Sequence, residues 1–488
     1  VGLGLYGVRN IPLVGREEER DALWESMHRV RSRHRLYTIC LRGPAGYGKS
    51  RLAEWFCERT HEVGTAHVLK AVHSPIQGAS DGITPMLIRF LQCAGSTFRQ
   101  AEEKVPDILE RLGMTDAEDI QTILDLMAPY FAGGSEHKTR VRLENETERY
   151  VVIRRFLQHL SKSRPVLVWL DDIHWGLDTL GFVLHLQETL RKLEVPILLL
   201  LTVREEALVE QPQETEMLDE ILAAKRTHSV HIGPLHQEDR PVLIRELLGL
   251  EGDVAAQVEE RTAGNPLFAV QLVGDWVQRG LLEYGTHGFR LKEGAEVDFP
   301  DSLYQVWGGQ IDYILQHHGE DEAIALELAA VLGQTVDYTE WLEACAELGV
   351  SPARGLIDEL ISYDLATRPK RHGDKTWSFV HSMLRESLER RAREARRWQD
   401  LHLACERMLR KHKGMDFSRR RGLHLLAAGK FEGALMPLEI GIHQKIDAGD
   451  FRAAEMLLDE REEALYLLDV DDTDVQWGRQ WLLRCKLE

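Results

Sequence analysis

Residues 43–50 carry the pattern best suited to chemistry in this chain, Gly43-Pro44-Ala45-Gly46-Tyr47-Gly48-Lys49-Ser50. The pattern fits G-x-x-x-x-G-K-S/T, and it lies between an apolar run and a helical one, which is the context that a phosphate-binding loop needs. Glycines let backbone N–H groups point into one concavity, and the helix N-terminus adds partial positive charge. We therefore expect residues Gly43 to Arg51 to bind the phosphates of ATP or ADP, with Lys49 on the β- and γ-phosphates and the Ser50 hydroxyl on Mg²⁺.

A second candidate element is an apolar run that ends in two acidic residues, Val166-Leu167-Val168-Trp169-Leu170-Asp171-Asp172. A buried strand of this kind places its terminal carboxylates at the carboxyl edge of a parallel sheet, beside the phosphate-binding loop. This is the pattern of a Walker B element. We expect Asp171 to hold Mg²⁺ through water and Asp172 to polarise the attacking water.

Two further side chains near these runs each have two interpretations. Arg204 directly follows the apolar run Ile197–Val203, where it would either sense the γ-phosphate or form an ordinary surface ion pair. His174 lies two residues after Asp172, and packing or capping at the turn is favoured over contact with nucleotide or metal. Lys49, Asp172 and Arg204 are thus the candidate catalytic residues.

Short apolar runs alternate with amphipathic ones through the first two-fifths of the chain. Runs rich in β-branched and aliphatic residues predict strands that are buried on both faces of a parallel sheet. The predicted strands are Leu36–Leu41, Ala66–Val72, Val166–Leu170, Ile197–Val203 and Ser229–Ile232. The predicted helices between them include Glu17–Arg31, Ser50–His61, Glu144–Ser161 and Leu177–Leu193. This alternation predicts a doubly wound α/β P-loop core.

Beyond Pro234 the chain is predicted to be almost entirely helical. Helices are expected at His236–Leu250 and at Asp253–Gly280, the second interrupted at residues 264–266. Further helices lead to a predicted hairpin between residues 366–368 and 377–379, a combination typical of a winged helix. After Leu401, the pattern of residues 428–434 recurs at 448–454, which predicts stacked α-hairpins similar to tetratricopeptide repeats, although the offset of 20 residues is shorter than their period of about 34.

Composition and charge exclude several classes of protein. The chain has 488 residues, of which 43% are hydrophobic and 28% charged, so it is an ordinary globular sequence of about three domains. Its formal charge of −19 disfavours broad coating by nucleic acid unless a local basic patch exists. The six cysteines lie far apart without CxxC spacing, which indicates a reducing, cytoplasmic setting rather than disulfides or zinc. The longest apolar run, Val195–Val203, is too short to cross a membrane.

In combination, the motifs resemble those of STAND-class ATPases, relatives of AAA+ and origin-recognition ATPases. The resemblance rests on residues 14–17 (Val-Gly-Arg-Glu), the phosphate-binding loop, residues 171–175, residues 202–204 and Gly264-Asn265-Pro266-Leu267-Phe268, which occur in the family's order. It implies that Val14, Gly15 and Arg16 lie over the adenine side of the nucleotide. It also implies that Pro266, in a helical lid, lies against the base or ribose.

The segment Phe379-Val380-His381-Ser382-Met383-Leu384-Arg385-Glu386 resembles the winged-helix motif of the same family. The family's histidine hydrogen-bonds the ADP β-phosphate, which makes His381 a candidate nucleotide sensor, with packing or capping as the equal alternative. The domains predicted on this basis are a linker at 1–12, the P-loop ATPase core at 13–234, a helical lid at 235–298, a winged helix at 299–400 and truncated repeats at 401–488.

The leading hypothesis is a slowly hydrolysing ATPase switch that couples nucleotide state to a fused effector, for which a Ser/Thr kinase upstream of Val1 is the first expectation. The chain begins with Val and ends within a helical pattern, and we interpret it as part of a longer bacterial regulator. The expected partners are this effector, an activating ligand or protein at the C-terminal repeats and, with ATP, further copies of the chain; no membrane partner is expected, and nucleic acid is disfavoured.

Two alternatives belong to other classes. The first is a DNA-binding AAA+ initiator or loader. It is favoured by the basic residues of the predicted hairpin, which are Arg368, Lys370, Arg371, His372 and Lys375. The second is a scaffold that nucleotide stabilises but that never hydrolyses ATP. Substitution of Asp172 separates the scaffold from the switch.

Overall fold

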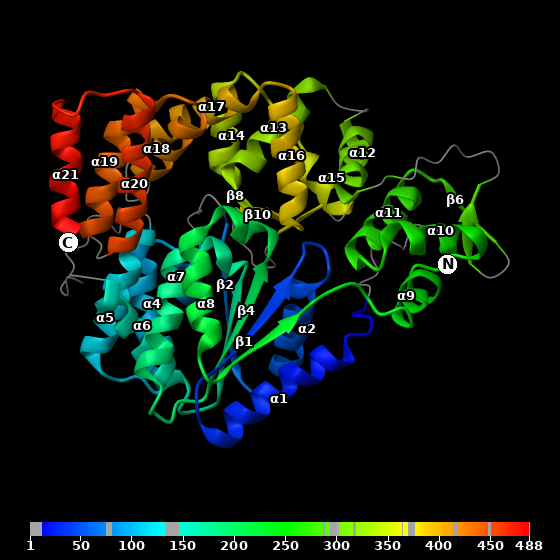
Figure 1. The fold of residues 1–488 in the computed structure, drawn as a ribbon, viewed down its shortest axis with the longest axis horizontal. Coiled ribbons are helices and arrows are strands. Elements are labelled where there is room, and N and C mark those ends of the chain that lie inside the picture. The colour runs from blue at the N-terminus through cyan, green and yellow to red at the C-terminus, as the bar shows by residue number, and fades with distance from the viewer. Residues whose placement is uncertain are drawn as a thin grey trace.

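The computed structural model describes residues 12–74, 81–131, 146–285, 288–292, 300, 302–315, 319–363, 365–368, 376–412, 417–447 and 450–487. Its first part is built on a five-stranded parallel sheet in the order β2-β3-β4-β1-β5 (Figure 1). The strands are β1 Tyr37–Gly43, β2 His67–Val72, β3 Val166–Asp171, β4 Ile197–Arg204 and β5 Thr227–His231. Each lies within two residues, at either end, of a strand that the apolar runs predict, so the α/β P-loop core is confirmed.

Helices cover both faces of this sheet. Those of the core are α1 Glu17–Arg33, α2 Lys49–Glu62, α3 Ile83–Phe90, α4 Phe98–Arg111, α5 Ala117–Met127, α6 Glu146–Leu160, α7 Leu177–Thr189 and α8 Pro212–Ala223. Along β4, Leu198 and Leu200 pack with α1 and α2, whereas Leu199 and Leu201 pack with α3 to α8. Because successive side chains of a strand point to opposite faces, the unbroken run of leucines fills two cores at once.

The register of the strands determines where the candidate site lies. Gly43 at the end of β1 is paired with Arg204 at the end of β4, and Asp171 at the end of β3 is paired with Val72 of β2. The loop after β1 and the acidic end of β3 therefore share the carboxyl edge of the sheet, with β4 between them. Helices α3 to α5, inserted between β2 and β3, were not predicted, and residues 132–145, including the predicted start of α6, lie outside the described residues.

The segment after β5 differs from the predicted helix His236–Leu250. It forms the short α9 Asp239–Pro241 and the π-helical η6 Val242–Leu247, in which Leu248 N donates to Leu243 O, five residues earlier, at 2.9 Å. Pro241 lacks the N–H that a continuous α-helix would use, which favours this irregular turn. Helices α10 Gly252–Thr262 and α11 Pro266–Gln278 follow the predicted interruption, and an unpredicted hairpin joins β6 Leu282–Tyr284 to β7 Phe289–Leu291.

The third part contains five helices and a three-stranded antiparallel sheet in the order β8-β10-β9. Its elements are α12 Leu303–Leu315, α13 Glu320–Leu332, β8 Thr335–Asp337, α14 Tyr338–Glu347, α15 Leu356–Ser362, β9 Ala366–Thr367, β10 Thr376–Phe379 and α16 Ser382–Glu394. The predicted hairpin is present, while its turn, with Lys370, Arg371, His372 and Lys375, lies outside the described residues. One hydrophobic core runs through residues 235–409 and joins this part to the preceding helices.

The last part is a row of helices, α17 Trp398–Arg410, α18 Phe417–Ala427, α19 Phe431–Asp447, α20 Phe451–Leu467 and α21 Val475–Leu487. They extend back toward the core, so that the start of α20 lies near α6 and α7 (Figure 1). Of the recurring pattern, Ala448 and Gly449 lie outside the described residues. Among the helices that the structure describes, none combines the length and apolarity that a membrane span requires.

Candidate functional site

The loop after β1 forms a cradle because its glycines adopt conformations that other residues rarely take. Gly46 and Gly48 have φ values of 84° and 96°, and a Cβ on Gly46 would lie 2.9 Å from the Asn265 side chain. Gly48 precedes α2 and has no side chain to cap it, so the N–H groups at the start of that helix face the loop, where an anion can bind. The amide of Ala45 donates to Glu206 Oε1 at 3.0 Å, so a carboxylate already occupies one amide of the cradle.

Lys49 projects back into this loop. Its side chain is 5% exposed, and Nζ donates to the carbonyl oxygens of Gly43 at 2.8 Å and Pro44 at 2.6 Å. Burial lowers the pKa of Lys49 to about 8, although the nearby Asp172 carboxylate opposes this shift. A buried ammonium that is held only by carbonyl dipoles is well placed to pair with phosphate oxygens.

Oxygen atoms gather at the end of β3. Ser50 Oγ donates to Asp171 Oδ1 at 2.9 Å, and Thr202 Oγ1 donates to the same oxygen at 2.7 Å. The other carboxylate oxygen, Asp171 Oδ2, lies 3.7 Å from Lys70 Nζ. A hydroxyl and a carboxylate in this arrangement are the hard donors that Mg²⁺ prefers, so Ser50 and Asp171 fit a shared magnesium site as the sequence predicts.

Asp172 is held beside Asp171 with its backbone in the left-handed region, at φ 50°. Its amide donates to Thr202 Oγ1 at 2.8 Å, so Thr202 positions both acidic residues. Burial raises the pKa of Asp172 to about 6, with a further rise from Asp171 and an opposing effect of Arg204. The carboxylate is therefore close to the pKa range of a general base at neutral pH.

Arg204 connects this site with the helices that follow the core. Its Nε lies 3.8 Å from Asp172 Oδ1, while its other nitrogens donate to Glu386 Oε1 at 2.9 Å and Ser382 Oγ at 2.6 Å. Both partners belong to α16, and Tyr304 of α12 donates to the second oxygen of Glu386 at 3.2 Å. The guanidinium is 11% exposed, so this is a part-buried contact between two regions rather than a surface ion pair.

The residues expected near the adenine lie on the other side of the loop. Arg16 is 4% exposed and donates to Tyr47 O at 3.2 Å, and a Cβ on Gly15 would meet Asp239 of α9. Val14 packs against the hydrophobic core of residues 235–409. Pro266 begins α11, and the next residue, Leu267, donates its amide to Gly46 O at 3.4 Å. The structure thus brings these predicted residues together around the phosphate-binding loop.

The two histidines occupy different positions. His174 is 1% exposed and accepts a hydrogen bond from Arg204 N at 3.4 Å, and burial lowers its pKa to about 2, which fits the packing and capping interpretation. His381 precedes α16, and its ring lies 6.1 Å from that of Trp307. Burial lowers the pKa of His381 to about 4, so the imidazole is neutral. Its role as a nucleotide sensor stays a prediction. The Arg51 side chain pairs with Glu54 at 2.9 Å on the outer side of α2.

Sequence reasoning did not assign roles to several side chains that complete the site. Thr202 joins the two acidic residues, Glu206 lies on the loop amide, and Ser382 and Glu386 hold Arg204. His73 bonds Asp171 O at 2.8 Å and Thr179 Oγ1 at 2.9 Å. Thr202 could have been predicted from the sequence, because it is a hydroxyl residue near the end of the apolar run that forms β4, the strand beside β3. The contacts of Arg204 with α16 have no such local signal.

We expect nucleotide affinity to depend on pH through Lys49. Phosphate oxygens favour the charged amine, so binding raises the Lys49 pKa above its unbound value of about 8. The affinity is thus full below pH 7 and falls above pH 8 by up to about tenfold per pH unit, as calorimetric titration between pH 6.5 and 9.5 would show. Lys49→Arg, which stays charged, is expected to bind with a flat profile. A flat profile for the unmodified chain would contradict the assignment.

Comparison with known proteins agrees with this geometry. Residues 12–201 match the family model of the AAA ATPase domain, and no curated protein matches the chain. The fold is similar to that of a signal transduction ATPase with numerous domains (STAND) and a tetratricopeptide repeat sensor from Pyrococcus horikoshii, with 14% identity, 98% of this chain and 68% of that chain covered, and a TM-score of 0.43.

Two other solved structures are similar to about four-fifths of the chain. For the Walker-type ATPase of Pyrococcus abyssi the identity is 14%, the coverage is 78% of this chain and 97% of that chain, and the TM-score is 0.36. For the ORC1 protein of Aeropyrum pernix, solved in complex with DNA, the corresponding values are 16%, 80%, 97% and 0.34. The match of the family model shows that residues 12–201 are an AAA ATPase domain, a family whose activity is ATP hydrolysis.

Proposed function

We propose that the chain is an ATP-operated signalling switch of the STAND type, in which Arg204 reports the nucleotide state to α16. The observation that carries this proposal is the position of one guanidinium 3.8 Å from Asp172 and hydrogen-bonded to Glu386 and Ser382. A γ-phosphate bound beside Asp172 would compete with Glu386 for the same cation. ATP and ADP would then differ in how firmly α16 is held, which is the difference that a switch requires.

The nucleotide would bind in the loop of residues 43–51, with Lys49 on the phosphates. Ser50 and Asp171 would hold Mg²⁺, which neutralises charge on the β- and γ-phosphates. Asp172 would orient the attacking water and accept its proton, and the pKa of about 6 keeps its carboxylate ionised at neutral pH. Arg16 and Pro266 would enclose the nucleotide between the core and the lid. Slow turnover fits a switch, because a signal requires a long-lived state.

The input would arrive at the C-terminal helices. Asp450, which caps α20, lies 3.3 Å from Arg149 and 3.2 Å from Lys445, and Arg149 also pairs with Asp178 at the start of α7. The two cations lower the pKa of Asp450 to about 2 despite its burial, so the ion pair is intact at neutral pH. Since α7 follows directly on residues 171–175, this buried cluster links the position of α20 to the acidic end of β3.

An activating ligand or protein that pulls the repeats from the core would break this cluster. The released chain would then bind ATP, associate with further copies and act on an effector fused upstream, for which a kinase is our proposal. These partners follow from the switch hypothesis and not from a contact in the structure.

Hydrogen exchange of the α16 amides, compared between ADP and a non-hydrolysable ATP analogue, tests the proposal. We expect exchange at residues 382–394 to be at least about tenfold faster with the ATP analogue, because the analogue draws Arg204 away. Glu386→Gln is expected to give the fast exchange with either nucleotide.

Glu394→Gln is the matched control, since Glu394 lies on the same helix and its ion pair with Arg390 is 64% exposed on both sides. This variant is expected to behave like the unmodified chain. Equal α16 exchange with the two nucleotides would contradict a switch at Arg204 and leave a nucleotide-stabilised scaffold as the better description.

A further inference from the structure

The edge of the sheet opposite the nucleotide site collects an unusual amount of positive charge. Four loops lead into the sheet at this edge, one before each of β3, β4, β1 and β5, and these strands lie side by side in that order. The cations of these loops, with Arg33 at the end of α1, are Lys162, Arg164, Arg191, Lys192, Arg33, Arg35, Lys225 and Arg226. Glu194 is the acidic residue of the same loops, within a chain whose net charge is −19.

Contacts connect the loops before β5, β4 and β1, and the loop before β3 lines the same cleft as residues of the β1 and β4 loops. Arg226 donates to the carbonyl oxygen of Arg191 at 3.0 Å, which joins the β5 loop to the β4 loop. Arg35 lies 3.8 Å from Glu194, which joins the β1 loop to the β4 loop. With strands about 4.8 Å apart, four neighbouring loops place their cations along a line of roughly 14 Å.

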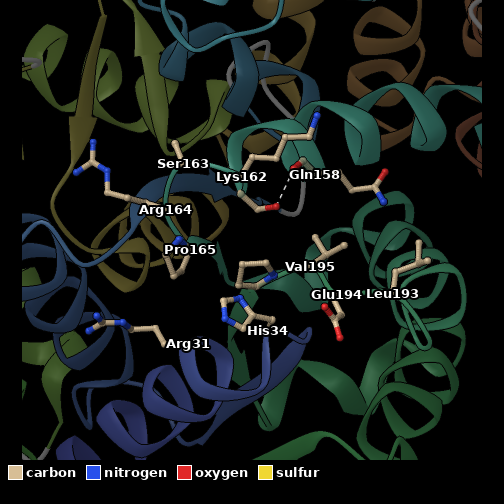
Figure 2. Close-up of a pocket in the computed structure, with 12 residues that line it drawn as sticks. Arg31, His34, Gln158, Lys162, Ser163, Arg164, Pro165, Leu193, Glu194 and Val195 are labelled. Atoms are coloured by element: carbon tan, nitrogen blue, oxygen red, sulfur yellow. Dashed lines mark hydrogen bonds between the residues drawn. The ribbon is translucent and has the colours of Figure 1, made fainter.

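A cleft of about 660 Å³ opens in this row. Figure 2 shows Arg31 and His34, from the end of α1, across the cleft from Ser163 and Arg164 of the loop before β3. Lys162 and Ser161 line it as well, and Glu194, which lies on its rim, is the residue that Arg35 faces. Guanidinium, ammonium, imidazole and hydroxyl groups around one concavity are the donors that bind phosphate.

We propose that this edge, the basic row, binds the phosphate backbone of duplex DNA without reading its sequence. A line of cations fits a linear polyanion better than it fits a plane, and the cleft would take one phosphate of the strand. B-form DNA carries one charge per about 1.7 Å of axis, so several phosphates face a row of this length. The acidic remainder of the surface would confine the contact to the row.

This surface is separate from the nucleotide site and from the predicted wing. The phosphate-binding loop lies at the carboxyl edge of the sheet, the basic row at the amino edge, so that both can be occupied together. Arg368, the basic hairpin residue that the structure describes, pairs with Asp358 and is remote in the fold from these loops. Binding of a duplex to the basic row does not require a switch at Arg204.

The test is fluorescence anisotropy of a labelled 20-base-pair duplex of mixed sequence, titrated with the full chain from 50 to 300 mM NaCl. With about four phosphates neutralised, we expect the logarithm of the binding constant to fall with that of the salt concentration at a slope of about −3 to −4. Lys162→Glu with Arg164→Glu is expected to weaken binding at least tenfold and to flatten this slope.

Lys430→Glu with Lys486→Glu is the matched control, because it changes the charge equally at exposed residues of the C-terminal helices. The control variant carries the same change in net charge as the row variant, and we expect it to change the affinity for the duplex less than twofold. Should the first variant fail to fold, Lys162→Ser with Arg164→Ser removes the cations without adding acid, and thermal unfolding with ATP binding verifies the fold.

Four results would overturn the proposal. The first is no duplex binding at 50 mM NaCl, and the second is an equal loss in the row variant and its control. The third is a row variant that loses thermal stability but binds the duplex normally, because the cations then act only on the C-termini of the helices before these loops. Binding to anionic vesicles in preference to the duplex would likewise replace DNA with a lipid surface.

Discussion

Replacement of Lys49 by alanine is expected to lower the affinity for ATP and for ADP by at least about 100-fold. The ammonium contributes charge-assisted hydrogen bonds of about 1.5–3 kcal/mol each to phosphate oxygens, and the truncated side chain leaves those oxygens without a cation in a part-buried cradle. Calorimetric titration with each nucleotide measures the change. The loss is larger for ATP than for ADP if Lys49 contacts the γ-phosphate as well as the β-phosphate.

Thermal unfolding of the variant without nucleotide separates loss of binding from loss of fold. In the unbound protein Lys49 Nζ bonds only the carbonyl oxygens of Gly43 and Pro44, so its removal exposes two acceptors that water can reach. The midpoint temperature of unfolding without nucleotide is thus expected to change little. Lys430→Ala, at an exposed position between α18 and α19, serves as the control. Retention of nanomolar ADP affinity by Lys49→Ala would refute the assignment of the phosphate-binding loop.

The parts of the site that sequence predicts are those whose signal is local. Gly46 and Gly48 predict backbone with positive φ, and the run from Val166 to Leu170 predicts a buried strand. The direction of that strand then places Asp171 at the carboxyl edge of the sheet. The order of strands then brings β3 and β1 to either side of β4, which explains why Ser50 and Asp171 meet although 121 residues separate them. Prediction succeeds there because the parallel α/β architecture admits few arrangements.

The contacts of Arg204 could not be predicted in this way. Ser382 and Glu386 lie 178 and 182 residues further along the chain, in a helix whose position depends on the packing of every intervening element. The sequence therefore left Arg204 between a γ-phosphate sensor and a surface ion pair, and the structure shows a part-buried contact with α16. The same holds for Arg149 and Asp450, which are 301 residues apart.

Helices α3 to α5 were missed for another reason. They are inserted between β2 and β3, in a stretch that the strand–helix alternation passes over. Thr97 begins α4 with a complete capping box, in which its hydroxyl accepts from Gln100 N and the Gln100 side chain accepts from Thr97 N. This is a sequence-level helix start. The unpredicted π-helical turn at Val242–Leu247 has no comparable signal beyond Pro241.

The buried cluster at Asp450 and the Arg204 contact suggest how two regions could report on one nucleotide. Both hold helices against elements at the carboxyl edge of the sheet. Asp450 does so through Arg149, which also pairs with Asp178 of α7, and Glu386 does so through Arg204 of β4. Removal of one partner from a buried ion pair costs about 3–5 kcal/mol, because it leaves a charge without compensation. A ligand that separates Asp450 from Arg149, whose side chains are both buried, must supply free energy of that order, which sets how strong an activating signal at the C-terminal helices has to be.

Replacement of Asp172 by asparagine is expected to reduce kcat for ATP hydrolysis by about 100-fold or more, while the affinity for ATP changes less than about threefold. The amide keeps the shape of the side chain but cannot accept a proton from the attacking water, a contribution of about 10²–10⁴ in rate. Release of phosphate under multiple-turnover conditions measures kcat. In the unmodified chain, kcat falls as the pH drops through about 6, where Asp172 becomes protonated.

Two comparisons make this result specific to Asp172. Asp107→Asn, at an exposed position of α4, is the matched control and is expected to hydrolyse ATP normally. Asp171→Asn is expected to raise the Mg²⁺ concentration needed for half-maximal turnover, because Asp171 and Ser50 share the hydroxyl–carboxylate contact of 2.9 Å that fits the metal. Equal turnover by the Asp172→Asn variant and the unmodified chain would remove Asp172 from catalysis and favour a scaffold that binds nucleotide without consuming it.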